Sequence, residues 1–413
     1  MTSTGFTTTA LHLDRLAKPE HGAMHKAIHT SIAYGYEKAE DLAAVFQGRQ
    51  KGFAYSRQAN PTVQALENRV TAFEDGIGSV CFATGMAALG AIFFAFLKRD
   101  DHIVSSQFLF GNTASMLATL EQMGVGVTFV DSTDAANVKA ALTPKTRLVL
   151  VETIANPVTQ VSDLDGIGAL CKERGLIYVV DNTVTSPYLF KPKAVGATFS
   201  VNSLSKYFGG HGAALGGSVT DCGVFDWSDD PGIFEGYKAT TPVEQWGLIQ
   251  LRRKGLRDFG GTLSPEAAHT LALGTETLAL RMERSCDNAQ KLAEFLARQK
   301  AVVEVNHPGL ESHPQHGIAT RLFKRPGALM SFALDDRHDA LAFMSNLNLV
   351  VNSTNLGDTR TLGIAVAPTI FFELGRDRRA AMGIREGLVR LSVGIEDIDD
   401  LIEDFAQALA KLG

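Results

Sequence analysis

Val179-Val180-Asp181-Asn182-Thr183 is followed, a short way along the chain, by Ser203-Leu204-Ser205-Lys206-Tyr207-Phe208-Gly209-Gly210-His211-Gly212, and these two runs determine which fold we expect. The apolar residues 177–180 are β-branched or aromatic, so they predict a buried strand that ends at Asp181. An acid at such a position usually serves either chemistry or a turn. The second run places one lysine, Lys206, between two serines and a glycine-rich loop.

These residue types suit a site for pyridoxal phosphate (PLP). That cofactor needs a lysine for its Schiff base and a carboxylate that keeps its pyridine nitrogen protonated, so that the ring can accept electrons. The hydroxyls of Ser203 and Ser205, with nearby glycine amides, can hold its phosphate. Taken alone, Lys206 would be an ordinary solvated lysine and Asp181 a turn residue. The combination favours the cofactor, with Lys206 and Asp181 as catalytic residues.

Both runs resemble the Cys/Met-metabolism family of fold-type I PLP-dependent enzymes, which includes cystathionine γ-synthases, cystathionine lyases, methionine γ-lyases and O-acylhomoserine sulfhydrylases. The resemblance extends from about Phe53 to the C-terminus. It implies an α/β fold with a mostly parallel, seven-stranded type of sheet between helices, a smaller C-terminal α/β domain and an N-terminal arm. We expect the arm at 1–58, the PLP-binding domain at 59–260 and the substrate domain at 261–413.

Length and composition are those of a soluble globular protein, and 413 residues suffice for two domains. The net charge of −6 and the absence of a dense Lys/Arg stripe argue against nucleic-acid binding. The N-terminus has no apolar signal core, and the longest apolar run, 85–97, is too short to span a membrane. We therefore expect a cytoplasmic protein.

We expect no metal site. The four cysteines are far apart and form no Cys-x-x-Cys pair. His25 and His29 have helical spacing but no third ligand nearby. His313 and His316 enclose a proline, which disfavours the helix that would align their rings.

The order of predicted elements supports the implied fold. Strands alternate with helices up to Asn182, which is typical of a parallel sheet with helices on both faces. Ser264 and Pro265 predict the start of a long amphipathic helix to about Gln299, interrupted near Gly274. Residues 1–58 lack a core pattern, so we expect an extended arm that lies on a neighbouring subunit.

Two further motifs concern the phosphate. Tyr55 and Arg57 are two residues apart in a segment that we expect to be extended, so both side chains could reach one anion. The alternative is that Arg57 forms a surface ion pair and Tyr55 is a packed tyrosine. The family has a Tyr-x-Arg-x-x-Asn-Pro-Thr motif here, which implies that both residues bind the cofactor phosphate of the adjacent subunit. In Thr84-Gly85-Met86, Thr84 is a plausible helix cap, and the family's Ser-Gly-Met implies that the amides of Gly85 and Met86 bind phosphate.

The position of Phe110 bears on the leaving group. The family usually has a tyrosine there, which stacks on the cofactor ring and can protonate the leaving group. Phe110 keeps the ring face but lacks the phenolic acid. A thiolate leaving group benefits from an acid more than a carboxylate does. Phe110 therefore favours good leaving groups, unless it only fills the core.

Resemblance also implies a set of substrate-binding residues. Asn156, in Glu-Thr-x-x-Asn-Pro, would lie by the cofactor's ring hydroxyl and the substrate carboxylate. Arg390 matches the family's Arg-Leu-Ser-x-Gly-x-Glu and can clamp that carboxylate in bidentate fashion. Asn355 stands where sulfhydrylases often have Asn-Val-Gly-Asp. The family's next motif, on a loop over the substrate, is largely lost at 365–371, where Thr369 is one of the residues kept.

The resemblance implies an enzyme of γ-chemistry that works as a homotetramer, a dimer of active dimers, on a small amino acid. Asn355 and Phe110 favour γ-replacement on a γ-substituted homoserine, as in an O-acylhomoserine sulfhydrylase or a cystathionine γ-synthase. The altered loop leaves open a γ-lyase acting on canavanine, methionine or cystathionine. A catalytically silent PLP-binding scaffold is the alternative of another class, and intact Lys206, Asp181 and Arg390 count against it.

Overall fold

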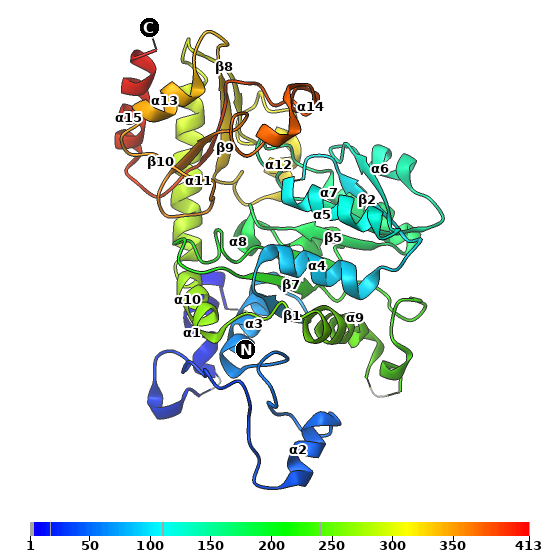
Figure 1. The fold of residues 1–413 in the computed structure, drawn as a ribbon. Helices are drawn as coiled ribbons and strands as arrows, with labels where there is room; N and C mark the ends of the chain where they lie inside the picture. The colour runs from blue at the N-terminus through cyan, green and yellow to red at the C-terminus, as the bar shows by residue number, and fades with distance from the viewer. Residues whose placement is uncertain (1–3, 17, 110, 240, 413) are drawn as a thin grey trace.

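The structure is a computed structural model that describes residues 4–16, 18–109, 111–239 and 241–412. This part of the chain forms two sheets covered by helices (Figure 1). The larger sheet has the strand order β1-β7-β6-β5-β4-β2-β3. Its strands are β1 (Gly78–Phe82), β2 (His102–Ser106), β3 (Gly126–Val130), β4 (Thr146–Glu152), β5 (Ile177–Asp181), β6 (Phe199–Asn202) and β7 (Gly217–Asp221).

The larger sheet is mostly parallel, as the sequence predicts. Strands β3, β2, β4, β5 and β6 pair in parallel. Strand β7 is the exception, because it runs antiparallel to both β6 and β1. The parallel strands therefore end at one edge of the sheet, and Glu152 lies opposite Asp181 there.

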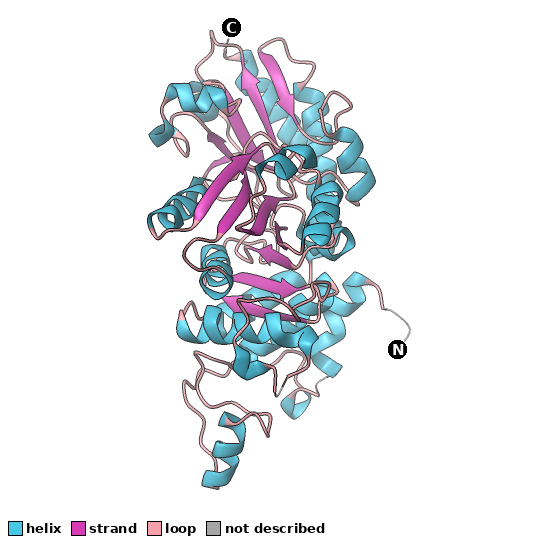
Figure 2. Cartoon of the chain, turned by 90° about the vertical axis from the view of Figure 1, so that its right-hand side faces the viewer, coloured by secondary structure: helices cyan, strands magenta, loops and turns pink. Residues whose placement is uncertain are grey.

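Helices cover both faces of this sheet (Figure 2). On one face, Val179 and Val201 share an apolar cluster with α4; on the other, Tyr178 and Val180 share one with α7 and α11. The helices around the sheet are α3 (Pro61–Glu74), α4 (Gly85–Phe96), α5 (Gly111–Gln122), α6 (Ala135–Ala141), α7 (Leu164–Arg174), α8 (Ser186–Leu189), α9 (Trp246–Gln250) and the π-helical η5 (Leu251–Asp258), with short 3₁₀ turns at η2 (Pro192–Val195), η3 (Glu235–Tyr237) and η4 (Val243–Gln245).

Helices α10 (Pro265–Thr275) and α11 (Leu278–Leu296) connect the two sheets. The predicted long helix is interrupted as expected, and Ser264 caps its start through the amide of Ala267. The smaller sheet has the order β10-β11-β12-β9-β8. Its domain contains β8 (Val302–Asn306), α12 (His316–Leu322), β9 (Leu329–Leu334), α13 (Ala340–Asn346), β10 (Val351–Asn352), β11 (Leu362–Ala365), η6 (Phe372–Leu374), α14 (Arg376–Ala381), β12 (Leu388–Ser392) and α15 (Ile398–Ala410).

The N-terminal region is only partly extended, which corrects the sequence-based expectation. It contains α1 (Phe6–Leu16), η1 (Glu20–Gly22) and α2 (Ala39–Phe46). Helix α1 packs on its own chain, since the ring of Phe6 stacks on Phe73 of α3 with centroids 4.4 Å apart. The segment that carries α2 projects from the body of the molecule (Figure 1). Within the described ranges, the helices are too short or too polar to cross a lipid bilayer.

Candidate active site

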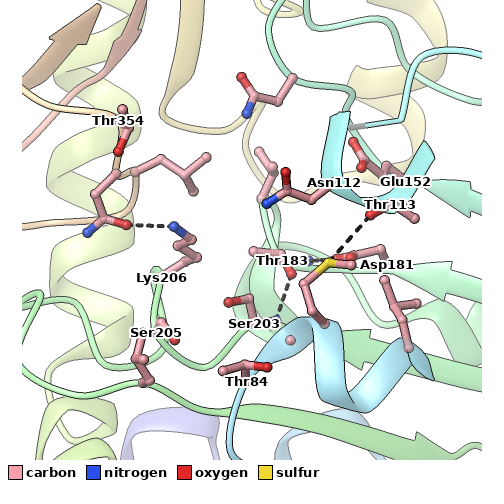
Figure 3. A pocket seen from close by; sticks show the side chains of 18 of the residues that line it. Thr84, Asn112, Thr113, Glu152, Asp181, Thr183, Ser203, Ser205, Lys206 and Thr354 are labelled. Carbon is pink, nitrogen blue, oxygen red and sulfur yellow. Dashed lines mark hydrogen bonds between the residues drawn. The ribbon is translucent and has the colours of Figure 1, made fainter. Parts of the chain in front are cut away.

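A cavity of about 570 Å³ lies where the parallel strands end, beside segment 354–356 of the smaller domain (Figure 3). Such crevices outside the carboxyl ends of strands are the usual binding sites of open α/β sheets. The structure brings most of the sequence-predicted site residues into its wall. These are Gly85, Met86, Asn156, Asp181, Ser203, Ser205, Lys206 and Asn355.

Lys206 lies in the turn after β6 and points into the cavity. Two backbone hydrogen bonds hold this turn. The amide of Lys206 donates to Ser203 O at 3.1 Å, and the amide of Gly210 donates to Lys206 O at 2.8 Å. Lys206 Nζ donates to Asn355 Oδ1 at 2.6 Å, so the lysine bridges the two domains. Burial, reinforced by the charge of Arg390, lowers the pKa of Lys206 to about 8. The amine is therefore a better nucleophile and base near neutrality than an ordinary lysine.

Asp181 provides a carboxylate at the end of β5. Its Oδ1 accepts the amide of Thr183 at 2.9 Å. Burial raises the pKa of Asp181, and the hydrogen bonds of Thr183 oppose that rise. A carboxylate that is costly to charge when alone is stabilised by a cation placed beside it.

The N-terminus of α4 forms the other end of the cavity. Thr84 caps this helix by accepting the amide of Ala87 at 3.0 Å, and the first amides of a helix have no intrahelical acceptor. A Cβ on Gly85 would lie 2.9 Å from Ser203 Cβ, so glycine keeps this end open. The hydroxyl of Ser205 is engaged by Gly216, whose amide it accepts at 2.9 Å. Ser203 is thus the freer hydroxyl for an anion.

Arg390 does not line the cavity, and its guanidinium lies against the carbonyls of 353–355; its expected role at the substrate carboxylate stays a prediction. It is fully buried on β12, and its Nη2 donates to the carbonyls of Ser353, Thr354 and Asn355 at 3.3, 3.4 and 2.9 Å. Its Nε is buried with no hydrogen-bond partner among the described residues. Burial lowers the pKa of Arg390 to about 10.

Segment 365–371, where the family's loop motif is largely lost, does not line the cavity. Val366 and Phe371 are buried in an apolar cluster with Ile384. Thr369 bonds back to the carbonyl of Ala365 in its own turn and does not line the cavity.

Tyr55 and Arg57 also lie outside the cavity of their own chain. They occupy a turn, not the extended segment that we expected, because the amide of Gln58 donates to Tyr55 O at 3.0 Å. The guanidinium of Arg57 lies 5.5 Å from the ring centroid of Tyr55 and donates to the carbonyl of Arg257. Phe110 lies outside the described residues.

Some cavity residues were not predicted as site residues. Asn112 and Thr113 follow the Phe110 position directly, and Glu152 ends β4 beside Asp181 (Figure 3). The rule that polar residues at strand ends share one edge of a sheet would have found Glu152. The same rule would have found Thr183, which follows the end of β5, whereas Leu215 and Thr354 gave no comparable signal.

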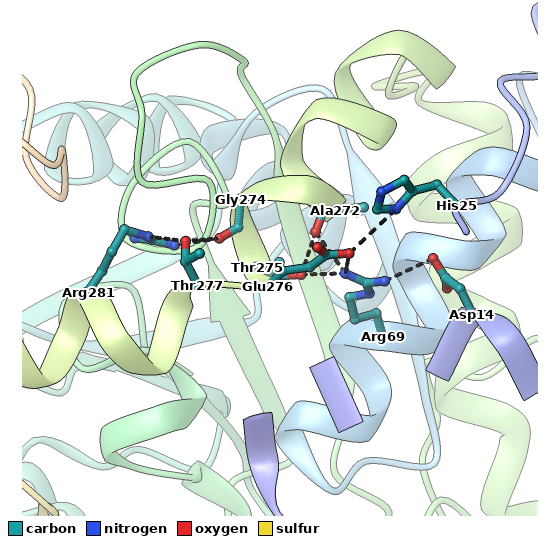
Figure 4. Close-up of polar contacts among 9 residues, drawn as sticks. All are labelled: Asp14, His25, Arg69, Ala272, Gly274, Thr275, Glu276, Thr277 and Arg281. Carbon is teal, nitrogen blue, oxygen red and sulfur yellow. Dashed lines mark hydrogen bonds and ion pairs between the residues drawn. The ribbon is translucent and has the colours of Figure 1, made fainter. Parts of the chain in front are cut away.

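Arg281 of α11 fixes the lysine turn from behind. Its guanidinium donates to Tyr207 O at 2.7 Å, to Phe208 O at 3.0 Å and to Gly274 O at 2.7 Å. Figure 4 shows Arg281 and Arg69 on either side of the junction between α10 and α11. Arg69 donates to the carbonyl of Ala272 at 2.8 Å and ties α1 to this junction through Asp14 at 2.9 Å.

The residues present fit PLP. Asp181 is a buried acid that a protonated pyridine nitrogen would stabilise, and Lys206 offers an amine with a lowered pKa. The start of α4 with Ser203 forms an anion cradle that a Cβ on Gly85 would fill. Asn156 Oδ1 is buried in the wall and has no hydrogen-bond partner in the part of the chain that the structure describes, so it is available to a hydroxyl donor.

Comparison with known proteins agrees with this chemistry. Residues 7–410 match the family model described as Cys/Met metabolism PLP-dependent enzyme. The chain is 36% identical to an L-methionine gamma-lyase from Fusobacterium nucleatum (99% of this chain, 98% of that one) and 37% identical to O-acetyl-L-homoserine sulfhydrylase 1 from Thermus thermophilus (98% and 100%).

A crystal structure of a Campylobacter jejuni protein superimposes with a TM-score of 0.93 at 29% identity, over 98% of this chain and 100% of that one. That protein carries an N'-pyridoxyl-lysine-5'-monophosphate residue. The family model, the two relatives and the fold thus agree over nearly the whole chain. The chain therefore belongs to the Cys/Met metabolism family of PLP-dependent enzymes.

Proposed function

We propose that the protein catalyses γ-replacement on an O-acylhomoserine, in which sulfide or a thiol displaces the acyl group. The observation that carries this proposal is the contact of Lys206 Nζ with Asn355 Oδ1 inside a cavity that also holds Asp181. Asn355 is the residue by which the sequence leans to the sulfhydrylases. The relatives alone do not separate replacement from elimination, because a lyase and a sulfhydrylase are almost equally similar.

PLP, when bound, supplies an electron sink for carbanions at the substrate. Lys206 would bind it covalently, Asp181 would serve its pyridine nitrogen, and Ser203, Ser205 and the amides of Gly85 and Met86 would hold its phosphate. Tyr55 and Arg57 of a second copy complete the phosphate site, since both lie outside their own chain's cavity. We accordingly propose a homotetramer built from active dimers, working in the cytoplasm.

The chain's own groups then handle the protons. Lys206 Nζ, with its lowered pKa, would take the proton from the substrate Cα, release it to the cofactor when that is bound, and then, neutral again, take a proton from Cβ. Asn355 Oδ1 holds that amine on the cavity side of the turn. Asn156 and Arg390 bind the substrate carboxylate, for which Arg390 exchanges its carbonyl contacts at 353–355. Departure of the γ-substituent leaves an unsaturated carbon to which a thiol adds.

γ-Elimination is the second candidate, because it uses the same residues until the γ-substituent has left. If water and protons reach the unsaturated carbon before a thiol does, the products are an α-keto acid and ammonia. The similarity to methionine γ-lyases supports this candidate. Methionine, cystathionine and canavanine are its candidate substrates.

A product assay separates the two. The purified holoenzyme is offered O-acetylhomoserine, O-succinylhomoserine, cystathionine, methionine and canavanine, each with and without sulfide, and products are followed by mass spectrometry and keto-acid detection. Homocysteine formed from an O-acyl substrate only when sulfide is present supports the proposal. Keto acid or homoserine released from one substrate without any thiol makes the protein a γ-lyase. No turnover of any substrate, despite a visible PLP band, would favour the silent scaffold.

A further inference from the structure

A buried glutamate contacts both strand ends that lead into the candidate cofactor site. Glu74 is the last residue of α3, and its side chain is fully buried. One carboxylate oxygen, Oε1, accepts three hydrogen bonds: from Asn182 Nδ2 at 3.3 Å, Ser200 Oγ at 2.9 Å and Asn202 Nδ2 at 2.6 Å. These donors belong to β6 and to the residue after β5, and the two strands are neighbours in the sheet. Glu74 thus crosslinks them.

The three donors to Glu74 lie on the face of the large sheet that is opposite the cavity, because side chains alternate along a strand. Successive residues of a strand point to opposite faces of the sheet. Asp181 lines the cavity, and the next residue, Asn182, points to Glu74. Asn202 points to Glu74, and the next residue, Ser203, lines the cavity. Each cavity residue therefore shares a peptide unit with a residue that Glu74 holds.

Glu74 is the acceptor that Asn202 depends on. Asn182 has other contacts, since its Nδ2 also donates to Phe190 O at 2.9 Å and its Oδ1 accepts from Thr185. Among the described residues, the amide nitrogen of Asn202 donates only to Glu74, and its Oδ1 is buried without a partner. Removing the carboxylate leaves a buried donor unsatisfied, which is unfavourable and therefore favours movement of the strand end.

We propose that Glu74 is a positioning residue, which sets the spacing between the ends of β5 and β6 so that Asp181 and Ser203 reach the two ends of one cofactor molecule. This inference rests on the proposed function, which assigns Asp181 to the pyridine nitrogen and Ser203 to the phosphate. Glu74 itself contacts neither cofactor nor substrate, because it lies behind the sheet.

Glu74 can accept hydrogen bonds from β6 and Asn182 whether its carboxyl group is charged or protonated. Burial raises the pKa of Glu74 to about 7, against the hydrogen bonds of Asn202, Ser200 and Asn182 and the charge of Lys191. Burial also raises the pKa of Asp221, the last residue of β7, and of Cys222, the residue after it, and the charge of Glu74 contributes to the rise at Cys222. A protonated carboxyl keeps one carbonyl oxygen as an acceptor. The amide of glutamine offers the same acceptor, so Glu74→Gln should preserve the geometry.

The test measures PLP affinity of the apoenzyme by titration of its visible band, together with its thermal unfolding. We expect Glu74→Leu to raise the Kd for PLP at least ~10-fold and Glu74→Gln to stay within ~3-fold of wild type. Glu67→Gln is the matched control, because Glu67 is also buried on α3 but bonds the amide of Cys81 at 3.1 Å and Arg252 at 2.9 Å, away from β5 and β6. Glu67→Gln should lose stability with an unchanged Kd.

An unchanged Kd in folded Glu74→Leu would overturn the inference, and so would an equal rise of the Kd in Glu67→Gln, since the effect would then be general destabilisation. If Glu74→Leu does not fold, Asn202→Ala is tested instead, because it removes the hydrogen bond that Asn202 of β6 donates to Glu74. An unchanged Kd for PLP in Asn202→Ala rejects the inference. Failure of the proposed function is distinct, because it would show in the product assay as a wild-type enzyme that forms no homocysteine from any O-acyl substrate with sulfide, whatever its Kd for PLP.

Discussion

Lys206 differs from a surface lysine in its partner and in its proton affinity. Its Nζ is 2.6 Å from Asn355 Oδ1, and burial with the charge of Arg390 lowers its pKa to about 8. Near pH 7.5, about a quarter of such amines are neutral, against roughly 0.1% for a lysine in water. The structure therefore provides a reactive amine before any cofactor chemistry begins.

Replacing Lys206 with alanine should reduce turnover of every accepted substrate at least ~1,000-fold, because it removes both the covalent anchor and the proton carrier. Product formation by the purified variant, supplied with excess PLP, measures this loss. Circular dichroism of the same sample controls for folding. Turnover close to the wild-type rate would end the proposed mechanism.

The lowered pKa of Lys206 makes a separate prediction about pH. Only the neutral amine attacks an aldehyde, so raising the pH removes the proton and speeds attachment of PLP. The rate at which the visible band appears after apoenzyme and PLP are mixed should rise about tenfold per pH unit well below 8 and level off above about 8. A small-molecule lysine analogue under the same conditions is the control. If the rate instead levels off only near pH 10, the cavity does not lower the pKa of this lysine.

Strand β7 touches the phosphate end of the site through one glycine. A Cβ on Gly217 would lie 2.2 Å from the carbonyl oxygen of Thr84, so alanine there must displace the turn between β1 and α4. We expect Gly217→Ala to weaken PLP binding at least ~10-fold, which titration of the apoenzyme measures. Gly317→Ala is the control, because a Cβ on Gly317 of α12 meets nothing within 4 Å. Equal affinity in both variants would show that the Thr84 turn tolerates the shift.

The elements that the sequence predicts well are those with local signals. Thr84 and Ser264 cap α4 and α10 where the sequence places them, and Asp181 ends β5. Cavity residues contributed by these strand and helix ends were therefore predictable. The contacts of Arg390 with the carbonyls of 353–355 were not predictable, because they depend on how two distant segments pack, and its role at the substrate stays a prediction. The turn at 55–58 and the packing of 365–371 likewise depend on contacts far along the chain.

Tyr55 and Arg57 allow a test of whether two subunits share each active site. The segment that carries α2 projects from the body of the chain and precedes these two residues, neither of which lines its own cavity (Figure 1). If each arm completes the neighbour's site, a dimer of one Arg57→Ala chain and one Lys206→Ala chain has one site with both defects and one with none.

Mixing and refolding the two inactive variants in equal amounts should then restore about a quarter of the wild-type activity, because half of the dimers are mixed and each has one intact site. Each variant refolded alone is the control. Activity that stays at the level of the separate variants would mean that Arg57 serves its own chain or none.

The pairing of β1 with β7 also affects how the protein is made. Residues 78–82 find their strand partner only at 217–221, so at about 5–20 residues per second the ribosome leaves β1 unpaired for roughly 10–30 s. During that interval the apolar side chains of Val80 and Phe82, buried in the finished sheet, are exposed on the nascent chain. Chains stalled before Gly217 should thus be cut by protease within 78–96, and longer ones protected. The phosphate end of the site would be among the last parts of the large sheet to form on the ribosome.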